Sequence, residues 1–294
     1  MTIRTLPALL VLWLLPLFAL AAGADEPSPR RLEGEIAGAR WAALVPENWS
    51  GRLLLEAPDR RPAPLPPVAE LDAAAPDHQA LLAAGWALAT TSYRRSGTIL
   101  VDAIEDLRAL RGQLALEIGP AKTTIVAGTG MGGLVATLMA ERHADEFNAF
   151  LAIDPRFDLR DPRALRLRCD QQPRAPLLFL FGPATTAGAI EYRDRAGVVA
   201  NAESYVPVLW FQAPRDEHDP ATAGAGLPAA LEALVAWLQT REPPASRLDD
   251  LPAANEAGPE TVAPPAAEEK PAEPTPLPDE PPPTVPVDGA PAAR

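Results

Sequence analysis

The sequence has few of the residues that build disulfides and metal centres. Among 294 residues there is one cysteine, Cys169, and there are three histidines, which lie far apart in the chain. A single cysteine excludes an intramolecular disulfide, and the histidines show none of the spacings typical of zinc ligands. We therefore expect no metal site, and nothing in the composition calls for another cofactor.

The chain also lacks an excess of positive charge. It has 26 lysines and arginines against 39 acidic residues, and its formal net charge is −13. No basic stripe follows the chain, which argues against a nucleic-acid partner.

The long apolar run at the N-terminus has the features of a targeting segment. Arg4 precedes apolar residues from Leu6 to Ala22, and the small residues Ala22-Gly23-Ala24 follow. This order is typical of a secretory signal peptide, which we place at residues 1–24. A retained membrane anchor is the alternative, but the run is short for a full span and no basic cluster follows it. We expect an exported protein, periplasmic or secreted, with no stable membrane span after cleavage.

The C-terminal segment, residues 242–294, has a different composition. Its 53 residues include 15 prolines, 11 acidic and 3 basic side chains. Such a segment buries too little apolar surface to offset the entropy of ordering it, so we expect a disordered acidic tail. The tail is either a solubilising appendage or a contact for a protein partner.

Residues 25–241 remain for one domain with a single core. Within it, short apolar runs alternate with helical patterns, which predicts a mostly parallel sheet covered by helices on both faces. Pro207, inside the last apolar run, indicates an edge strand. We expect an N-terminal hairpin at 32–45, strands at 52–56, 86–91, 123–127, 149–153, 177–181 and 205–212, and helices near 78–84, 101–114, 134–139 and 227–238. A short stretch around Cys169 is expected to form a reduced cap.

A glycine-rich segment joins the expected strand at 123–127 directly to the next helix. It reads Gly128-Thr129-Gly130-Met131-Gly132-Gly133. The segment resembles the nucleophile elbow of the α/β-hydrolase family, G-x-S-x-G, with Gly130 at the position of the serine. The resemblance implies that the tight turn forms without the nucleophile that it normally presents.

Other segments resemble secreted esterases and peptidases of this family in the same order, over residues 33–240. They are residues 46–55, residues 85–97 and Glu217-His218-Asp219-Pro220, where the family carries its catalytic histidine. The resemblance makes His218 the candidate residual base. Asp154 is a candidate alternative acid, but we prefer a helix or turn cap before Pro155 as its role.

Two parts of the sequence depart from the family pattern. The loop at 56–59 carries Pro58, which removes a backbone donor, where relatives form part of the oxyanion hole. The loop at 182–186 has no carboxylate, although relatives usually carry the catalytic acid there. We therefore expect a hydrolase-like protein without the usual triad, which binds a small ester- or peptide-like ligand or a protein partner.

Three alternatives remain open. The first is an active serine-type esterase or peptidase that uses Ser92, Ser96 or Thr129 with His218. The second is a non-catalytic envelope module whose acidic tail recruits a partner. The third is a dinucleotide-binding protein, because Gly128, Gly130 and Gly133 also fit G-x-G-x-x-G, and Asp154 follows at a suitable distance. Several strands precede this motif, whereas the dinucleotide fingerprint opens the first strand–helix–strand unit.

Overall fold

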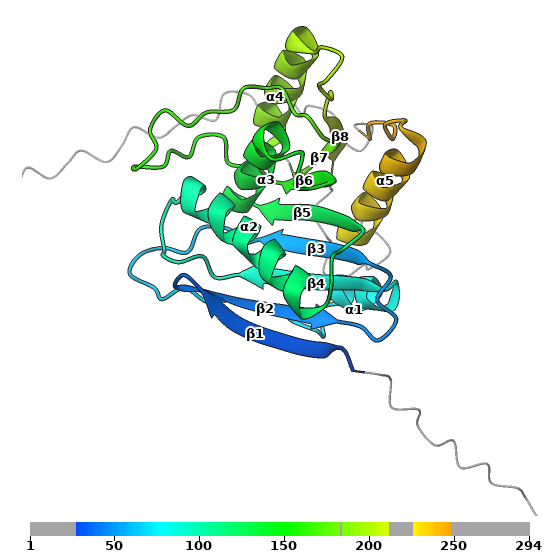
Figure 1. Ribbon diagram of the computed structural model, residues 1–294. Helices are drawn as coiled ribbons and strands as arrows, with labels where there is room; N and C mark the ends of the chain where they lie inside the picture. Colours follow the sequence, from blue (N-terminus) through cyan, green and yellow to red (C-terminus); the bar gives the residue numbers. More distant parts are fainter. Residues whose placement is uncertain (1–27, 183, 212–225, 248–294) are drawn as a thin grey trace, which may run out of the picture. The chain divides into compact units, whose positions relative to one another are not determined.

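The computed structural model describes residues 28–182, 184–211 and 226–247, and an eight-stranded sheet forms its centre (Figure 1). The strand order is β1-β2-β4-β3-β5-β6-β7-β8. The strands are β1 (Arg30–Ile36), β2 (Ala39–Val45), β3 (Arg52–Ala57), β4 (Trp86–Thr91), β5 (Thr123–Thr129), β6 (Ala149–Ile153), β7 (Leu177–Phe181) and β8 (Val208–Phe211). The pairs β1–β2 and β2–β4 are antiparallel and the other pairs are parallel, which confirms the expected mostly parallel sheet.

Helices cover both faces of this sheet (Figure 1). The helices α2 (Leu100–Glu117), α3 (Met131–Arg142) and α4 (Thr186–Val199) contribute to one apolar cluster. The helices α1 (Pro76–Ala83) and α5 (Leu227–Thr240) contribute to the cluster on the opposite face. The inner parallel strands are buried on both faces, which explains why the sequence shows them as continuous apolar runs rather than alternating ones.

The register of the central strands determines which loops meet. Ala57 of β3 pairs with Gly128 of β5, and Gly128 pairs with Ala152 of β6. The three strands run in the same direction, so the residues that follow them emerge at the same edge of the sheet. The loop after β3, the turn after β5 and the start of the segment after β6 therefore converge there.

Strand β8 lies at the edge of the sheet, as Pro207 indicates, and residues 243–247 run alongside it. Phe211 N–H donates to the Arg247 carbonyl at 2.8 Å, and Arg247 N–H donates to the Leu209 carbonyl at 2.9 Å. The Arg247 guanidinium lies 4.0 Å from the centroid of the Trp210 ring. The first residues of the segment predicted to be a tail thus pair with the exposed edge of β8, which would otherwise offer unpaired backbone groups.

Other predictions fall outside the described residues. They include the signal peptide at 1–24 and the part of the tail from residue 248 onward. Among the helices that the structure describes, none is both long and apolar enough to cross a membrane.

Candidate functional site

The turn between β5 and α3 holds Gly130 in an unusual backbone conformation. Its φ is +60° and its ψ is −113°, a region that non-glycine residues rarely occupy. Gly130 N–H donates to the Ile153 carbonyl at 3.0 Å, and its own carbonyl accepts from Arg156 N–H at 3.1 Å. These hydrogen bonds tie the turn to β6 and to the segment that follows it, so the conformation is held from two sides.

The neighbouring glycines are required by close backbone approach. A Cβ atom at Gly132 would lie 1.8 Å from the Ala57 carbonyl oxygen, and one at Gly128 would lie 2.3 Å from the Gly132 carbonyl oxygen. A Cβ atom at Gly133 would lie 2.8 Å from the Ile153 carbonyl oxygen. All three distances are below any real Cβ contact, so helix α3 packs this tightly against the sheet only with glycine at these positions. This packing accounts for the three glycines without a bound dinucleotide.

A carboxylate occupies the space directly in front of Gly130. A Cβ atom at Gly130 would lie 2.5 Å from Asp59 Cγ and 2.6 Å from Asp59 Oδ2. Asp59 Oδ1 accepts from Met131 N–H at 2.7 Å and from Arg60 N–H at 2.7 Å. Met131 is the first residue of α3, so the negative charge of Asp59 also lies at the positive end of the helix dipole.

The loop after β4 holds the loop that carries Asp59. The Tyr93 hydroxyl donates to the Pro58 carbonyl at 3.1 Å. The buried Asp106 carboxylate in turn accepts from Arg94 N–H at 2.9 Å and from Arg94 Nε at 2.7 Å, which fixes the turn that presents Tyr93. Burial and the nearby carboxylates raise the pKa of Tyr93 well above its usual value, so the hydroxyl stays a donor.

Asp154 lies at the same edge of the sheet but is engaged by its own surroundings. Its Oδ1 accepts from Gly182 N–H at 2.7 Å and from the Thr185 hydroxyl at 2.5 Å. These bonds join the end of β6 to the loop between β7 and α4. Because these bonds reach a loop 28 residues later in the chain, they differ from the local turn cap before Pro155 that the sequence suggested for Asp154. Its partner in a catalytic constellation, His218, lies outside the described residues.

The hydroxyl groups that the sequence offered as nucleophiles have backbone partners in two cases. Ser92 Oγ donates to the Tyr93 carbonyl at 2.8 Å, and Ser96 Oγ donates to the Leu65 carbonyl at 2.5 Å. Thr129 is exposed as the last residue of β5. Neither of the described histidines, His78 and His143, has a hydrogen bond to any of these hydroxyls.

An ion pair that the sequence analysis did not identify lies at the ends of β3 and α1. His78 Nε2 is 2.8 Å from Glu56 Oε1, and His78 Nδ1 is 2.7 Å from the Asp72 carbonyl oxygen. The hydrogen bond to Glu56 raises the pKa of His78 to about 9, against the opposing effect of burial. The imidazolium therefore holds the long β3–α1 loop against the sheet near neutral pH. No short motif in the sequence links these residues, because the pair depends on the fold.

Cys169 is a half-buried thiol rather than an activated one. Burial outweighs the positive charges of Arg142 and Arg160, which act to lower the pKa of this thiol. Burial, with a contribution from Glu141, raises the pKa of Cys169 far above its usual value. The thiol is therefore neutral and serves as an apolar lining group.

The free space beside Asp59 is small. A recess of about 100 Å³ adjoins Asp59, Tyr93 and Thr90. Small-molecule sites usually measure about 300–1,000 Å³, so this recess holds water or a small group in the described arrangement. A larger cavity of about 440 Å³ lies elsewhere, between α3 and α4, and Gly130 does not line it.

No protein-family model matches the sequence, and no curated protein sequence matches it. Solved structures do match. A candidate dipeptidyl aminopeptidase IV from Bacteroides ovatus has a TM-score of 0.50 at 13% identity, over 74% of this chain and 36% of that chain. An esterase of Pyrococcus furiosus has 0.49 at 15% identity, over 72% and 90% of the two chains. Est1E from Butyrivibrio proteoclasticus has 0.49 at 12% identity, over 70% and 99%.

Identities this low show the fold alone. The chain spans only 36% of the length of the Bacteroides ovatus protein. The first of these matches, whose TM-score reaches 0.50, and the strand order with its antiparallel start show that this chain has the α/β-hydrolase fold. The resemblance drawn from the sequence is confirmed at that level.

Proposed function

We propose that this chain, an α/β-hydrolase by fold, does not carry out the serine hydrolase reaction and acts instead as a binding protein. The observation that carries the proposal is the contact between Asp59 and the turn at Gly130. In the family, this turn presents the nucleophilic serine, and the N–H of the next residue helps to stabilise the oxyanion. Here the turn presents no side chain, and Asp59 takes the N–H of Met131.

The chemistry of acyl transfer explains why this arrangement opposes catalysis. A nucleophile needs an ionisable oxygen or sulfur within reach of a base, and glycine supplies neither. A negative carboxylate at the N-terminus of α3 also occupies the place where a developing oxyanion would be stabilised. A substrate carbonyl that entered the turn would have to displace Asp59 and lose its charge-assisted hydrogen bond.

The alternative of an active enzyme with a different nucleophile finds less support. Ser92 and Ser96 donate to backbone carbonyls, and Ser92 is only 6% exposed. Thr129 is exposed, but the base that the sequence offers for it, His218, lies outside the described residues. The hydrogen bonds of the two serines weigh against this alternative.

We also propose that the protein is exported and that its acidic tail contacts a protein partner. The signal-like segment at 1–24 supports export to the periplasm or the medium, and the acidic, proline-rich residues after 247 support a role in contacting a protein partner. Removing residues 248–294 keeps the pairing of Arg247 with β8 and should abolish capture of such a partner if the tail is the contact. Capture that survives this truncation would place the contact elsewhere.

A hydrolysis screen tests the proposal. The purified protein is assayed on short-chain and long-chain p-nitrophenyl esters and on aminoacyl and dipeptidyl chromogenic amides. We expect no turnover above the buffer rate. Turnover by the wild-type protein that disappears in Ser92→Ala, Ser96→Ala or Thr129→Val would show that the chain uses another nucleophile and would refute the proposal. Far-ultraviolet circular dichroism of each variant controls for folding.

A further inference from the structure

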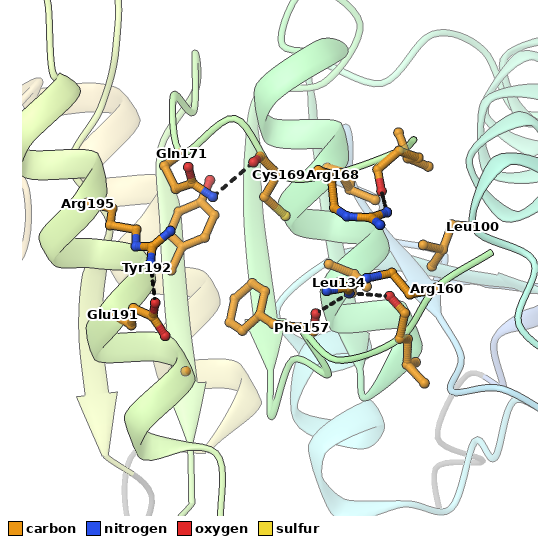
Figure 2. Close-up of a pocket in the computed structure, with 14 residues that line it drawn as sticks. Leu100, Leu134, Phe157, Arg160, Arg168, Cys169, Gln171, Glu191, Tyr192 and Arg195 are labelled. Atoms are coloured by element: carbon orange, nitrogen blue, oxygen red, sulfur yellow. Dashed lines mark hydrogen bonds and ion pairs between the residues drawn. The ribbon is translucent and has the colours of Figure 1, made fainter. Parts of the chain in front are cut away.

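The larger cavity lies beside α3, away from the turn at Gly130. It measures about 440 Å³, within the usual range for small-molecule sites. Helices α3 and α4 form two of its walls, and residues of the segment that joins β6 to β7, residues 154–176, line another side (Figure 2). None of Asp59, Gly130 and Met131 lines it, so the cavity is separate from the turn where the family places its chemistry.

One part of the cavity wall is apolar, and the rest is polar. Leu134 and Leu138 of α3 and Leu100 of α2 contribute aliphatic side chains. Phe157 and Tyr192 add an aromatic wall, with their rings stacked at 5.4 Å and tilted by 16°. Because these side chains come from three helices and the 154–176 segment, the apolar surface is concave and suits a chain or ring rather than a flat partner.

The polar residues around this interior carry an excess of positive charge. Among the described residues that line the cavity are Arg160, Arg168 and Arg195 and one acid, Glu191, a net charge of +2. Arg195 pairs with Glu191 at 2.6 Å, so Arg160 and Arg168 carry the excess. This local sign is opposite to the net charge of −13 of the whole chain.

The two unpaired arginines are held in place and keep free donors. Arg160 Nη1 donates to the carbonyls of Phe157 and Leu159, each at 2.7 Å, and Arg168 Nη1 donates to the Leu167 carbonyl at 2.8 Å (Figure 2). Within the described part of the chain, Nε and Nη2 of both side chains have no hydrogen-bond partner in the protein. A guanidinium with free donors in a fixed orientation is suited to a carboxylate, because it can bind both oxygens.

A buried carboxylate keeps the wall of the cavity in shape. Glu141, at 4% exposure, accepts from the backbone N–H groups of Asp170 and Gln171 at 2.9 and 2.8 Å and from the Tyr192 hydroxyl at 2.5 Å. These bonds join α3, α4 and the 154–176 segment. The cavity is thus a built feature of the fold and not a gap between loose loops.

We propose that this cavity binds an anion that carries an apolar chain, with the chain between α3, α4 and Phe157 and the carboxylate at Arg160 and Arg168. The proposal rests on the ligand-binding part of the proposed function and specifies its site and ligand class. Neutral or cationic ligands with the same apolar chain have no negative group to pair with these two arginines. The cavity should therefore prefer anionic ligands.

Titration calorimetry with sodium decanoate, below its micelle concentration, tests this proposal. Decylammonium carries the same chain with the opposite charge, and acetate carries the charge without the chain. We expect one decanoate per protein, and at least about tenfold weaker binding of both other probes. Arg160→Gln and Arg168→Gln should each weaken decanoate binding about tenfold.

The matched control is Arg166→Gln. Arg166 is exposed, lies in the same segment and does not line the cavity, so its loss changes the net charge equally without touching the site. Decanoate binding should be unchanged in this variant. Equal binding of decanoate and decylammonium, an equal effect of Arg166→Gln and Arg168→Gln, or no binding of decanoate would each overturn the proposal.

The two proposals fail separately. Ester hydrolysis through a serine or threonine would end the proposed function at the turn but leave decanoate binding in the cavity untouched. Absence of decanoate binding in a hydrolytically inactive protein would end the cavity proposal alone.

Discussion

The contact between Asp59 and Gly130 predicts an energetic coupling that a double-mutant cycle can measure. In Gly130→Ala, the new methyl group would lie 2.5 Å from the Asp59 carboxyl carbon, so the carboxylate has to move away. The φ of +60° adds backbone strain of about 1–3 kcal/mol for a non-glycine residue. Asp59→Ala alone removes the hydrogen bond to Met131 N–H, at a cost of about 1 kcal/mol, as for a lost helix cap.

The double variant loses that hydrogen bond only once. Gly130→Ala already displaces Asp59, so its cost includes the lost bond, and Asp59→Ala then adds little. We expect the double variant to be about 1 kcal/mol more stable than the sum of the single effects predicts. Urea unfolding followed by tryptophan fluorescence gives the three free energies, provided that the slope with urea is the same in all variants.

The control cycle combines Gly130→Ala with Asp194→Ala. Asp194 is an exposed acid of α4 that pairs with Arg193 and does not contact Gly130, so these two changes should be additive. If Asp59→Ala and Gly130→Ala are also additive, within about 0.5 kcal/mol, the carboxylate does not occupy the turn and the reasoning is refuted.

Three further predictions concern the scaffold around the site. The raised pKa of His78 means that its ion pair stabilises the fold fully below pH 6.5, and that this stabilisation is lost as the pH rises through about 9. The free energy of unfolding should therefore fall by about 2–3 kcal/mol over this window. The variant His78→Gln should not show this fall. Glu141→Gln replaces a buried acceptor of three hydrogen bonds and should lower the free energy of unfolding, measured with urea, by about 1–3 kcal/mol. A change near zero would show that other contacts hold the 154–176 segment. A chain that ends at Arg241 should lose stability relative to one that ends at residue 251, because it lacks the residues that pair with β8; equal melting temperatures would contradict this role.

Most strands of the sheet were predictable because each is a short, largely apolar run between turn residues, whereas β1 is mostly polar and exposed. Helix α4 was not assigned from the sequence. Its buried residues are Ala189, Tyr192 and Ala196, and two of them are alanines, which give a weak periodic signal among charged neighbours. The last strand was expected at 205–212, and β8 begins at Val208, directly after Pro207, because proline cannot donate to the ladder.

The site was predictable in its backbone but not in its contacts. The glycine spacing located the turn, and the structure adds that close approach to Ala57 and Ile153 demands those glycines. The loop at 56–59 stood out because Pro58 removes a donor, yet no motif indicates that Asp59 reaches Met131 N–H, 72 residues later in the chain. The strand register brings these loops together, and register is a property of the whole sheet.

The cavity depends even more on tertiary structure. Its arginines come from an irregular segment and from α4, and they have no common spacing in the sequence. Only the packing of α3 against α4 shows that these residues surround one space.

Fluorophosphonate labelling followed by intact-mass measurement tests the central claim most directly, because the reagent modifies an activated serine or threonine whatever the substrate. The purified protein should show no stoichiometric mass increase, since the turn at residue 130 presents no oxygen and Asp59 occupies the space in front of it. One equivalent of label on a serine or threonine, lost after heat denaturation of the protein, would contradict that claim.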